Sequence, residues 1–275
     1  MAVTKEEVKT VIRNLGGVLV GFAPASRWDE YGEVEPDYRP RSIWQETKSV
    51  IVVGIPVLLP ILETTPSINY VEQYDTSNIL LDQLAYRTSV YLTENGHGAI
   101  FFPRDAYGDI QILVKKPVAG FSHVFAAKYA GLGTIGYSHV LLTSKYGPRV
   151  RYVSIFTSLE LEPDPVIEKD LCIKCGICQR LCPSQAFTTR NEQIIAIMDK
   201  KACANHHARL RKEHRYPCGI CIKVCPVGDD RKVFNSQNSK LYLEEKEAIA
   251  KNPDDPRYKH WVHLRKHGSN GDRLF

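Results

Sequence analysis

Eight cysteines are the residues of this 275-residue chain best suited to chemistry, and all of them lie between positions 172 and 225. The first four form the run Cys172-x2-Cys175-x2-Cys178-x3-Cys182, which is followed by Pro183. Thiolates two residues apart on a tight turn can bind neighbouring irons of one 4Fe–4S cubane, whereas the cysteine before the proline reaches another cluster. The spacing therefore predicts iron–sulfur chemistry and a redox role.

The second run repeats the end of the first. It reads Cys218-x2-Cys221-x3-Cys225-Pro226 and lacks an early cysteine, which we expect Cys203 to replace. In each run, the cysteine before the proline is expected to bind the cluster held mainly by the other run. The chain is therefore predicted to bind two 4Fe–4S clusters. The predicted ligands are Cys172, Cys175, Cys178 and Cys225 for the first cluster, and Cys182, Cys203, Cys218 and Cys221 for the second.

Zinc binding and a disulfide framework are the alternatives for these cysteines. Three residues between a cysteine and the following Cys-Pro are not a zinc-ribbon spacing, which argues against zinc. A chain of this length that shows no secretory signal does not need disulfides to fold.

The bulk composition is that of an ordinary globular protein with one large domain or two smaller ones. Residues 1–7 are charged and do not resemble a signal peptide. The apolar stretch at residues 49–62 contains Pro56 and Pro60 and is shorter than the ~18 residues that a membrane span needs. A cytoplasmic protein without membrane contact is expected.

The formal net charge of the chain is +5. Eight thiolates would add about −8 and two oxidised cluster cores about +4, so the loaded protein is expected to carry about +1, which weakens the case for nucleic acid binding. Basic residues near the cysteines either offset the cluster charge or form a solvated face. These residues are Lys174, Arg180, Lys200, Lys201, Arg209, Arg211, Lys212, Arg215 and Lys223.

Hydrophobic patterning predicts an α/β fold for residues 1–160. Strands are expected at residues 17–24, 49–58, 99–103, 140–143 and 150–157, and helices after Thr4 and at residues 68–95 and 122–129. A bacterial-ferredoxin-like domain with two clusters is expected at residues 166–235, built around its metals. Residues 236–275 are expected to form a helix near 240–250 and a polar tail.

The segment Gly131-Leu132-Gly133-Thr134-Ile135-Gly136 matches the string G-x-G-x-x-G. A dinucleotide-binding fingerprint must follow a strand and open a helix. Here the string follows a predicted helix and precedes a predicted strand, so we reject dinucleotide binding at this site. Two interpretations stay open: a helix end with a tight turn, and a close approach of the backbone to a ligand.

Residues 126–136, followed by Leu141-Leu142 and Tyr146-Gly147, resemble the core motif of epoxyqueuosine reductases. Residues 36–41, 49–54 and 159–164 and the cysteine layout with lone Cys203 continue this likeness, which extends over about residues 15–230. That family is related to the reductive dehalogenases. In both, two 4Fe–4S clusters feed electrons to a cobalamin that lies against a nitroreductase-like α/β domain.

The resemblance implies cofactor-binding residues within the glycine segment. Gly131, Gly133 and Gly136 would line the face of the corrinoid, and Tyr137 and Ser138 would contact it. The protein would bind, orient and tune this cofactor. A flavin in place of the corrinoid is the alternative that the nitroreductase-like fold implies.

Two features depart from the family pattern. Epoxyqueuosine reductases carry an aspartate, taken as the proton donor, before the glycine motif, and residues 117–123 of this chain contain no acid. His123 is the candidate catalytic acid in its place, and a packed histidine is the alternative. About 40 residues follow the cluster domain, which are too few for the helical repeats that grip tRNA in longer relatives, so the resemblance argues against tRNA.

Three functions follow from these patterns. The first is an oxidoreductase that passes electrons through two 4Fe–4S clusters to a cobalamin, which reduces a small organic substrate. The second is a ferredoxin-type electron-transfer protein without cofactor chemistry of its own, and the third is a short epoxyqueuosine reductase acting on tRNA. A ferredoxin or flavodoxin is the expected electron donor.

Overall fold

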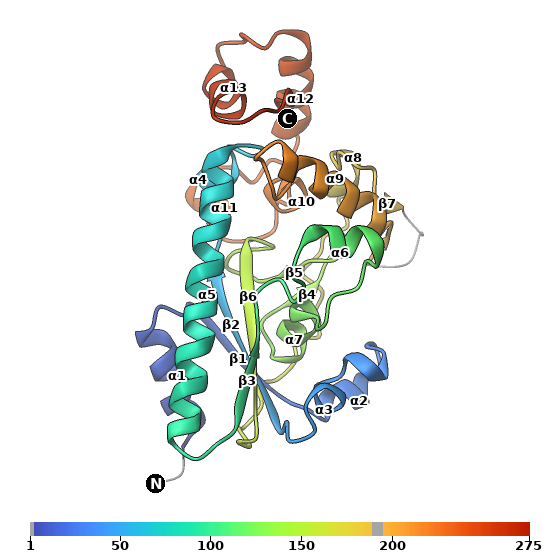
Figure 1. The fold of residues 1–275 in the computed structure, drawn as a ribbon. Coiled ribbons are helices and arrows are strands. Elements are labelled where there is room, and N and C mark those ends of the chain that lie inside the picture. The colour runs from blue at the N-terminus through green and yellow to red at the C-terminus, as the bar shows by residue number, and fades with distance from the viewer. Residues whose placement is uncertain (1–2, 189–194) are drawn as a thin grey trace.

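The structure, a computed structural model, describes residues 3–188 and 195–275, and its first part is built on a four-stranded sheet (Figure 1). The strands follow the order β1-β2-β6-β3, and every neighbouring pair is antiparallel. Their bounds are β1 (Leu19–Pro24), β2 (Ser49–Pro56), β3 (Ala99–Phe102) and β6 (Val150–Thr157). Each strand lies where the sequence predicts one, and the α/β class is confirmed.

Helices cover both faces of this sheet. The helices of this part of the chain are α1 (Lys5–Asn14), α2 (Arg27–Tyr31), α3 (Pro40–Ile43), α4 (Leu59–Leu62), α5 (Ile68–Glu94), α6 (Ile110–Lys115) and α7 (His123–Tyr129), with a 3₁₀ helix η1 (Pro36–Tyr38). Alternate side chains of the central strands enter two cores. Val53 and Ile155 pack toward α1 and α5, whereas Val52 and Phe156 pack with α7.

Local sequence signals fix where the covering helices begin. The capping box predicted at the N-terminus is present, since Thr4 accepts from the Glu7 amide and Glu7 accepts from the Thr4 amide. Ser67 caps α5 by accepting from the amide of Tyr70, and Ser122 caps α7 in the same way. The start of α5 lies beside the cysteine segment, since the Tyr70 ring is close to Gly219 and the Thr65 hydroxyl donates to the carbonyl of Cys218.

Two short strands follow α7. The bounds are β4 (Thr134–Ile135) and β5 (Leu141–Leu142), and they pair with each other. The predicted strand at residues 140–143 is therefore present but shorter. The sequence prediction missed β4 and α6.

The cysteine segment folds into short elements around a core of its own. They are α8 (Ile177–Arg180), β7 (Phe187–Thr188), β8 (Ile197–Met198), α9 (Lys200–Lys212), α10 (Ile220–Lys223) and α11 (Asp230–Val233). Leu181, Leu210 and Val224 are buried in this core together with Tyr74 and Tyr137 of the α/β part. The segment thus has more apolar packing than the sequence suggests, because part of its core comes from the neighbouring elements. The domain boundaries stay a prediction.

The C-terminal region differs from the expected helix and polar tail. The helix near 240–250 is confirmed as α12 (Leu241–Lys251), but a second helix, α13 (Lys259–Lys266), follows it. Arg265 of α13 is fully buried, and Val262 is nearly so. Figure 1 shows both helices at the end of the molecule opposite the N-terminus. None of the helices that the structure describes is long and apolar enough to cross a membrane.

Candidate functional site

The two cysteine runs fold in the same way. Each contains the tetrapeptide Cys-Gly-Ile-Cys, at residues 175–178 and 218–221. Gly176 and Gly219 have φ angles of +69° and +68°, a region that favours glycine. Each glycine is followed by a single helical turn, α8 or α10, which carries the second cysteine. The tight turn that the spacing predicts is therefore formed twice.

The four cysteines predicted for the first cluster come together. They line one cavity: Cys172, Cys175, Cys178 and Cys225. Burial, followed by the neighbouring sulfurs of Cys225, Cys175 and Cys172, raises the pKa of Cys178 to about 12. A thiol with such a pKa becomes a thiolate only when a metal core stabilises its charge.

The four cysteines predicted for the second cluster also lie close to one another. Burial raises the pKa of Cys218 to about 12, and the sulfurs of Cys203 and Cys182 act in the same direction. Burial and the Cys182 sulfur raise the pKa of Cys203 to about 11. The pKa of Cys221 is raised by burial and then by Cys218, Cys203 and Cys178. Because Cys178 belongs to the first set, the two sets adjoin.

A single metal ion does not suit this arrangement. Across residues 3–188 and 195–275, no three His, Cys, Asp or Glu side chains are placed to hold one ion. A cubane core is larger than one ion, so two sets of four sulfurs fit 4Fe–4S clusters better than zinc. Metal coordination by these eight residues stays a prediction.

Groups of the α/β part and of α11 reach the residues predicted as ligands of the first set. The amide of Tyr137 donates to Cys172 Sγ at 3.5 Å. Arg149 Nη1 and Arg231 Nε both donate to the carbonyl of Cys225 at 3.1 Å. Hydrogen bonds and nearby positive charge favour the reduced, more negative state of a cluster. These contacts can therefore tune the potential of the first cluster.

The glycine string follows α7 and precedes β5, as predicted, but it also contains the short strand β4, which was not predicted. Gly131 has a φ of +70°, and a Cβ there would lie 2.3 Å from the carbonyl oxygen of Pro165. A Cβ on Gly133 would lie 1.9 Å from the carbonyl oxygen of Leu142, and one on Gly136 would lie 2.8 Å from Leu142 Cδ1. The close approach at these glycines is thus to the chain itself. Their corrinoid contact stays a prediction.

Tyr137 and Ser138, the other two residues assigned to the corrinoid, are each 6% exposed. Both line the cavity of the first cysteine set. A cluster bound in that cavity would therefore lie beside these two residues. A corrinoid contact by these two residues likewise stays a prediction.

His123 is held by hydrogen bonds at both ring nitrogens. Its Nδ1 lies 2.8 Å from Ser154 Oγ and its Nε2 lies 2.9 Å from the carbonyl oxygen of Pro103. A carbonyl can only accept, so Nε2 carries the proton and Nδ1 accepts from the serine hydroxyl. Burial lowers the pKa of His123 to about 4. These contacts favour the packed histidine over the proton donor.

A buried polar group beside the cysteines escaped the sequence analysis. Tyr74 Oη and Arg151 Nη2 each donate to Asp105 Oδ1 at 2.7 Å. The Tyr216 hydroxyl lies 2.8 Å from that of Tyr107 and 3.3 Å from that of Tyr74. Arg151, a charge within an otherwise apolar strand, was the signal that could have pointed to it. We call these five residues the tyrosine–aspartate group.

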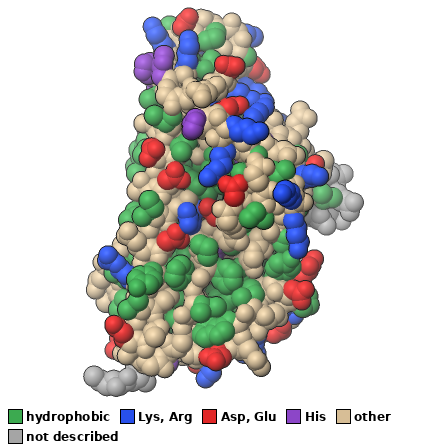
Figure 2. Space-filling view, in the orientation of Figure 1, with side chains coloured by type: hydrophobic (Ala, Val, Ile, Leu, Met, Phe, Trp, Pro, Cys, Tyr) green, Lys and Arg blue, Asp and Glu red, His purple; other side chains and the backbone are tan. Residues whose placement is uncertain are grey.

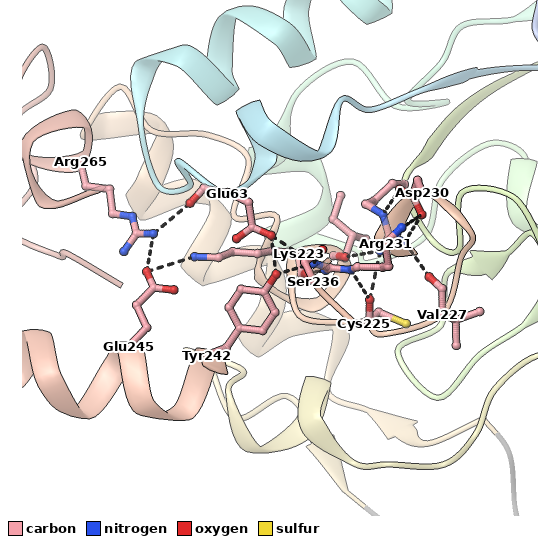
Figure 3. A network of polar contacts seen from close by, with 12 residues as sticks. Glu63, Lys223, Cys225, Val227, Asp230, Arg231, Ser236, Tyr242, Glu245 and Arg265 are labelled. Atoms are coloured by element: carbon pink, nitrogen blue, oxygen red, sulfur yellow. Dashed lines mark hydrogen bonds and ion pairs between the residues drawn. The ribbon is translucent and has the colours of Figure 1, made fainter. Parts of the chain in front are cut away.

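A second polar network ties the cysteine loop to the C-terminal helices (Figure 3). The fully buried Arg231 pairs with Glu63 at 3.1 Å and donates to the hydroxyl of Tyr242. Lys223 and Arg265, also fully buried, pair with Glu245 at 3.5 and 2.6 Å. The loop that carries the last three cysteines is thereby fixed against α12 and α13.

Comparisons with known proteins agree with the cysteine geometry. The family model for a 4Fe–4S dicluster domain matches residues 171–228. Tetrachloroethene reductive dehalogenase of Desulfitobacterium hafniense is 26% identical over 210 residues, which cover 71% of this chain and 35% of that protein. Epoxyqueuosine reductase of Listeria monocytogenes is 27% identical over 129 residues, covering 43% of this chain and 32% of the other. The chain spans about a third of the length of these curated relatives.

Solved structures of both kinds share the fold. A catabolic reductive dehalogenase in complex with 3-bromo-4-hydroxybenzoic acid superposes with a TM-score of 0.63 at 22% identity, over 94% of this chain and 37% of that chain. An epoxyqueuosine reductase with a modified tRNA-Tyr stem loop gives a TM-score of 0.56 at 17% identity, over 81% and 64% of the two chains. The chain is therefore related to both groups of reductases, as the sequence motifs predict.

Proposed function

We propose that this protein is an iron–sulfur oxidoreductase that carries electrons on two 4Fe–4S clusters to an acceptor at its nitroreductase-like α/β part. The observation that carries the proposal is the gathering of eight cysteines into two adjoining sets on paired Cys-Gly-Ile-Cys turns. The match to a dicluster domain and the relation to two groups of reductases support it. Adjoining clusters allow an electron to pass from one to the other.

Cobalamin is the acceptor that the resemblance favours, with a small organic molecule as the substrate. The environment of Gly131, Gly133 and Gly136 gives a corrinoid little support, because carbonyl groups and the Leu142 side chain occupy the space beside them. A cleft of about 740 Å³ lies nearby and is lined in part by Thr134 and Ile135. The proposal therefore does not depend on a corrinoid at the glycine string, and no step is routed through one.

Reduction of an organic substrate consumes protons as well as electrons. The tyrosine–aspartate group can supply them, since Tyr216 precedes the ligand Cys218 by two residues. Burial raises the pKa of Tyr107, so its hydroxyl stays protonated and gives up its proton only to a strongly basic product. Arg151 balances the charge of Asp105, to which Tyr74 donates. This group is our candidate for proton delivery near the second cluster.

Anaerobic reconstitution with iron, sulfide and cobalamin tests the proposal. After gel filtration, about eight irons per chain are expected for two cubanes. One cobalt per chain in addition would identify a corrinoid reductase. About eight irons without cobalt would leave the ferredoxin-type carrier or another acceptor, such as a flavin, which absorbance would reveal. Four irons or fewer would contradict the two-cluster proposal.

A further inference from the structure

The positive charge of the chain is concentrated on one helix. The 13 residues of α9 include five lysines and arginines and no acid: Lys200, Lys201, Arg209, Arg211 and Lys212. The whole chain has 36 basic and 31 acidic residues, so the remainder contains 31 of each. The helix itself therefore carries a formal charge of +5, with Asp199 and Glu213 as the acids at its two caps. We call the exposed side of this helix that carries Lys201, Arg209 and Lys212 the α9 basic face.

The α9 basic face covers the second cysteine set. Cys203, a predicted ligand of that set, belongs to α9. Ala204, Ala208 and Leu210 are buried in the core of the cysteine segment. Residues 201, 205, 209 and 212 are exposed and recur at spacings of three and four, so they lie on one face. In Figure 2, blue side chains gather on the part of the molecule that α9 and α6 occupy in Figure 1.

The placement of these charges opposes the local preference of a helix. Lys200 and Lys201 lie in the first turn of α9, where the helix dipole favours acids. Among the described residues of this helix start, Asp199, the N-cap residue, is the acid that offsets them, and it accepts from the amide of Ala202. A sequence that breaks a local rule without a compensating contact marks a functional surface more often than a structural one.

Apolar side chains border the charged ones. α6 packs against α9, and its residue Ile112 is 48% exposed. Val118, just after α6, is 41% exposed. A small surface that mixes basic and apolar residues is typical of transient electron-transfer contacts, which bury little area and rely on charge for encounter.

We propose that the α9 basic face docks an acidic electron-carrier protein, which passes electrons to the second cluster through Cys203. The inference rests on the proposed function and adds the surface and the chemistry of the donor. Opposite charge on donor and acceptor raises the rate of encounter, and this gain falls as salt screens it. The ligand Cys203 on the docking helix itself gives the electron a short path inward.

A nucleic acid is the other polyanion that such a surface can attract. Two of the five cations already face carboxylates, since Arg209 lies 3.6 Å from Glu213 and Arg211 lies 3.5 Å from Asp109. The position of the face directly on a cluster-bearing helix favours the redox partner. The experiment must therefore distinguish nucleic acid binding from the docking of a redox partner.

The experiment is stopped-flow reduction of the iron-loaded, full-length protein by a photoreduced acidic flavodoxin, followed by cluster absorbance. We expect the double variant Lys201→Glu/Lys212→Glu to lower the second-order rate constant at least about tenfold at low ionic strength and to flatten its salt dependence. The matched control, Lys246→Glu/Lys251→Glu on exposed positions of α12, changes the net charge equally and should retain the wild-type rate. Reduction by dithionite should stay unchanged in both variants.

Four results would overturn the docking proposal. One is a wild-type rate in the α9 variant. The second is an equal loss with the α12 control, which would mean that only net charge matters. The third is a lowered midpoint potential of the second cluster that accounts for the slower rate, which would make the cations tuning charges. The fourth is loss of a tRNA gel shift with an unchanged flavodoxin rate, which would make the face a nucleic acid surface.

A separate measurement isolates the proposed function. If the wild-type protein does not bind about eight irons, the oxidoreductase proposal fails before any donor is added. If it does, Lys174→Glu beside the exposed Cys175 tests the other entry point. Slower reduction in Lys174→Glu, with a wild-type rate in the α9 variant, would place donor docking at the first cluster and refute docking at α9.

Discussion

His123 should make the stability of this protein depend on pH in a predictable window. Its imidazole is neutral in the fold, because burial lowers its pKa from 6.5 to about 4 and Ser154 and Pro103 occupy both ring nitrogens. In the unfolded chain the pKa returns to the ordinary value. Between pH 6.5 and 4 the unfolded state therefore binds more protons than the folded state, and the free energy of unfolding falls as the pH falls.

The size of this effect follows from the two pKa values. Between pH 7.5 and 5.5, the difference in proton binding at His123 should remove about 1.3 kcal/mol from the free energy of unfolding. His123→Asn cannot titrate and should lose that much less over the same interval. Other titrating groups and the clusters contribute equally to both proteins, so the comparison isolates this residue.

Anaerobic urea titrations at pH 7.5 and 5.5, followed by circular dichroism, would measure the four free energies of unfolding. The variant should be less stable at pH 7.5, since it loses a hydrogen bond, but its pH dependence should be shallower by about 1.3 kcal/mol. Parallel losses in wild type and variant would show that His123 is solvated and would restore it as a proton donor. Unchanged m-values would confirm that the unfolded states are comparable.

Three further predictions concern the glycine string, the ligands and the buried arginine. Gly133→Ala should lower the free energy of unfolding by at least about 2 kcal/mol, because the new Cβ meets a backbone carbonyl. The control Gly108→Ala, whose Cβ meets only ordinary van der Waals contacts, should lack this loss, and thermal unfolding of the two variants compares them. Cys175→Ser and Cys203→Ser should each leave about four irons per chain by iron assay, and about eight irons in either would contradict the ligand sets. Arg149→Met should lower the free energy of unfolding, measured by urea titration, by about 3–5 kcal/mol, because Arg149 is fully buried and its loss leaves the Asp230 carboxylate without its partner. An unchanged free energy of unfolding would mean that the pair is solvated.

The parts of the fold that the sequence predicts well depend on nearby residues. The spacing of Cys175 and Cys178 reflects one turn, and the same turn recurs at Cys218 and Cys221, so the sequence predicts which cysteines lie close together. The strands of the sheet were recognisable because their apolar runs, such as residues 49–56, are buried on both faces. Short-range geometry and burial are legible in a sequence because the residues that decide them are neighbours.

The parts that the sequence did not predict depend on distant pairs. Tyr74 and Tyr216 are 142 positions apart, yet their hydroxyl groups meet. The sequence around His123 gives no sign of the Pro103 carbonyl that fixes its tautomer or of the Ser154 hydroxyl that donates to its other ring nitrogen. Position 133 needs a glycine because a Cβ there would collide with the carbonyl oxygen of Leu142, which the pairing of β4 with β5 brings close. At His123 and Gly133 a local pattern admitted two roles, and a contact from elsewhere in the chain decided which was more consistent with the structure.

The C-terminal helices should depend on the clusters for their docking. Five fully buried cations lie in this region, and in the described part of the chain their ion pairs involve three carboxylates, those of Glu63, Asp230 and Glu245; the cations are Arg149, Arg215, Lys223, Arg231 and Arg265. A buried unpaired cation is costly, and thiolate-ligated clusters bound close to the same loop would supply the missing negative charge. Removal of iron should therefore loosen α12 and α13, and trypsin should cleave at exposed Lys246 and Lys251 faster in the apo protein than in the loaded one. Equal cleavage rates with intact α/β fragments would show that the network is stable without the clusters.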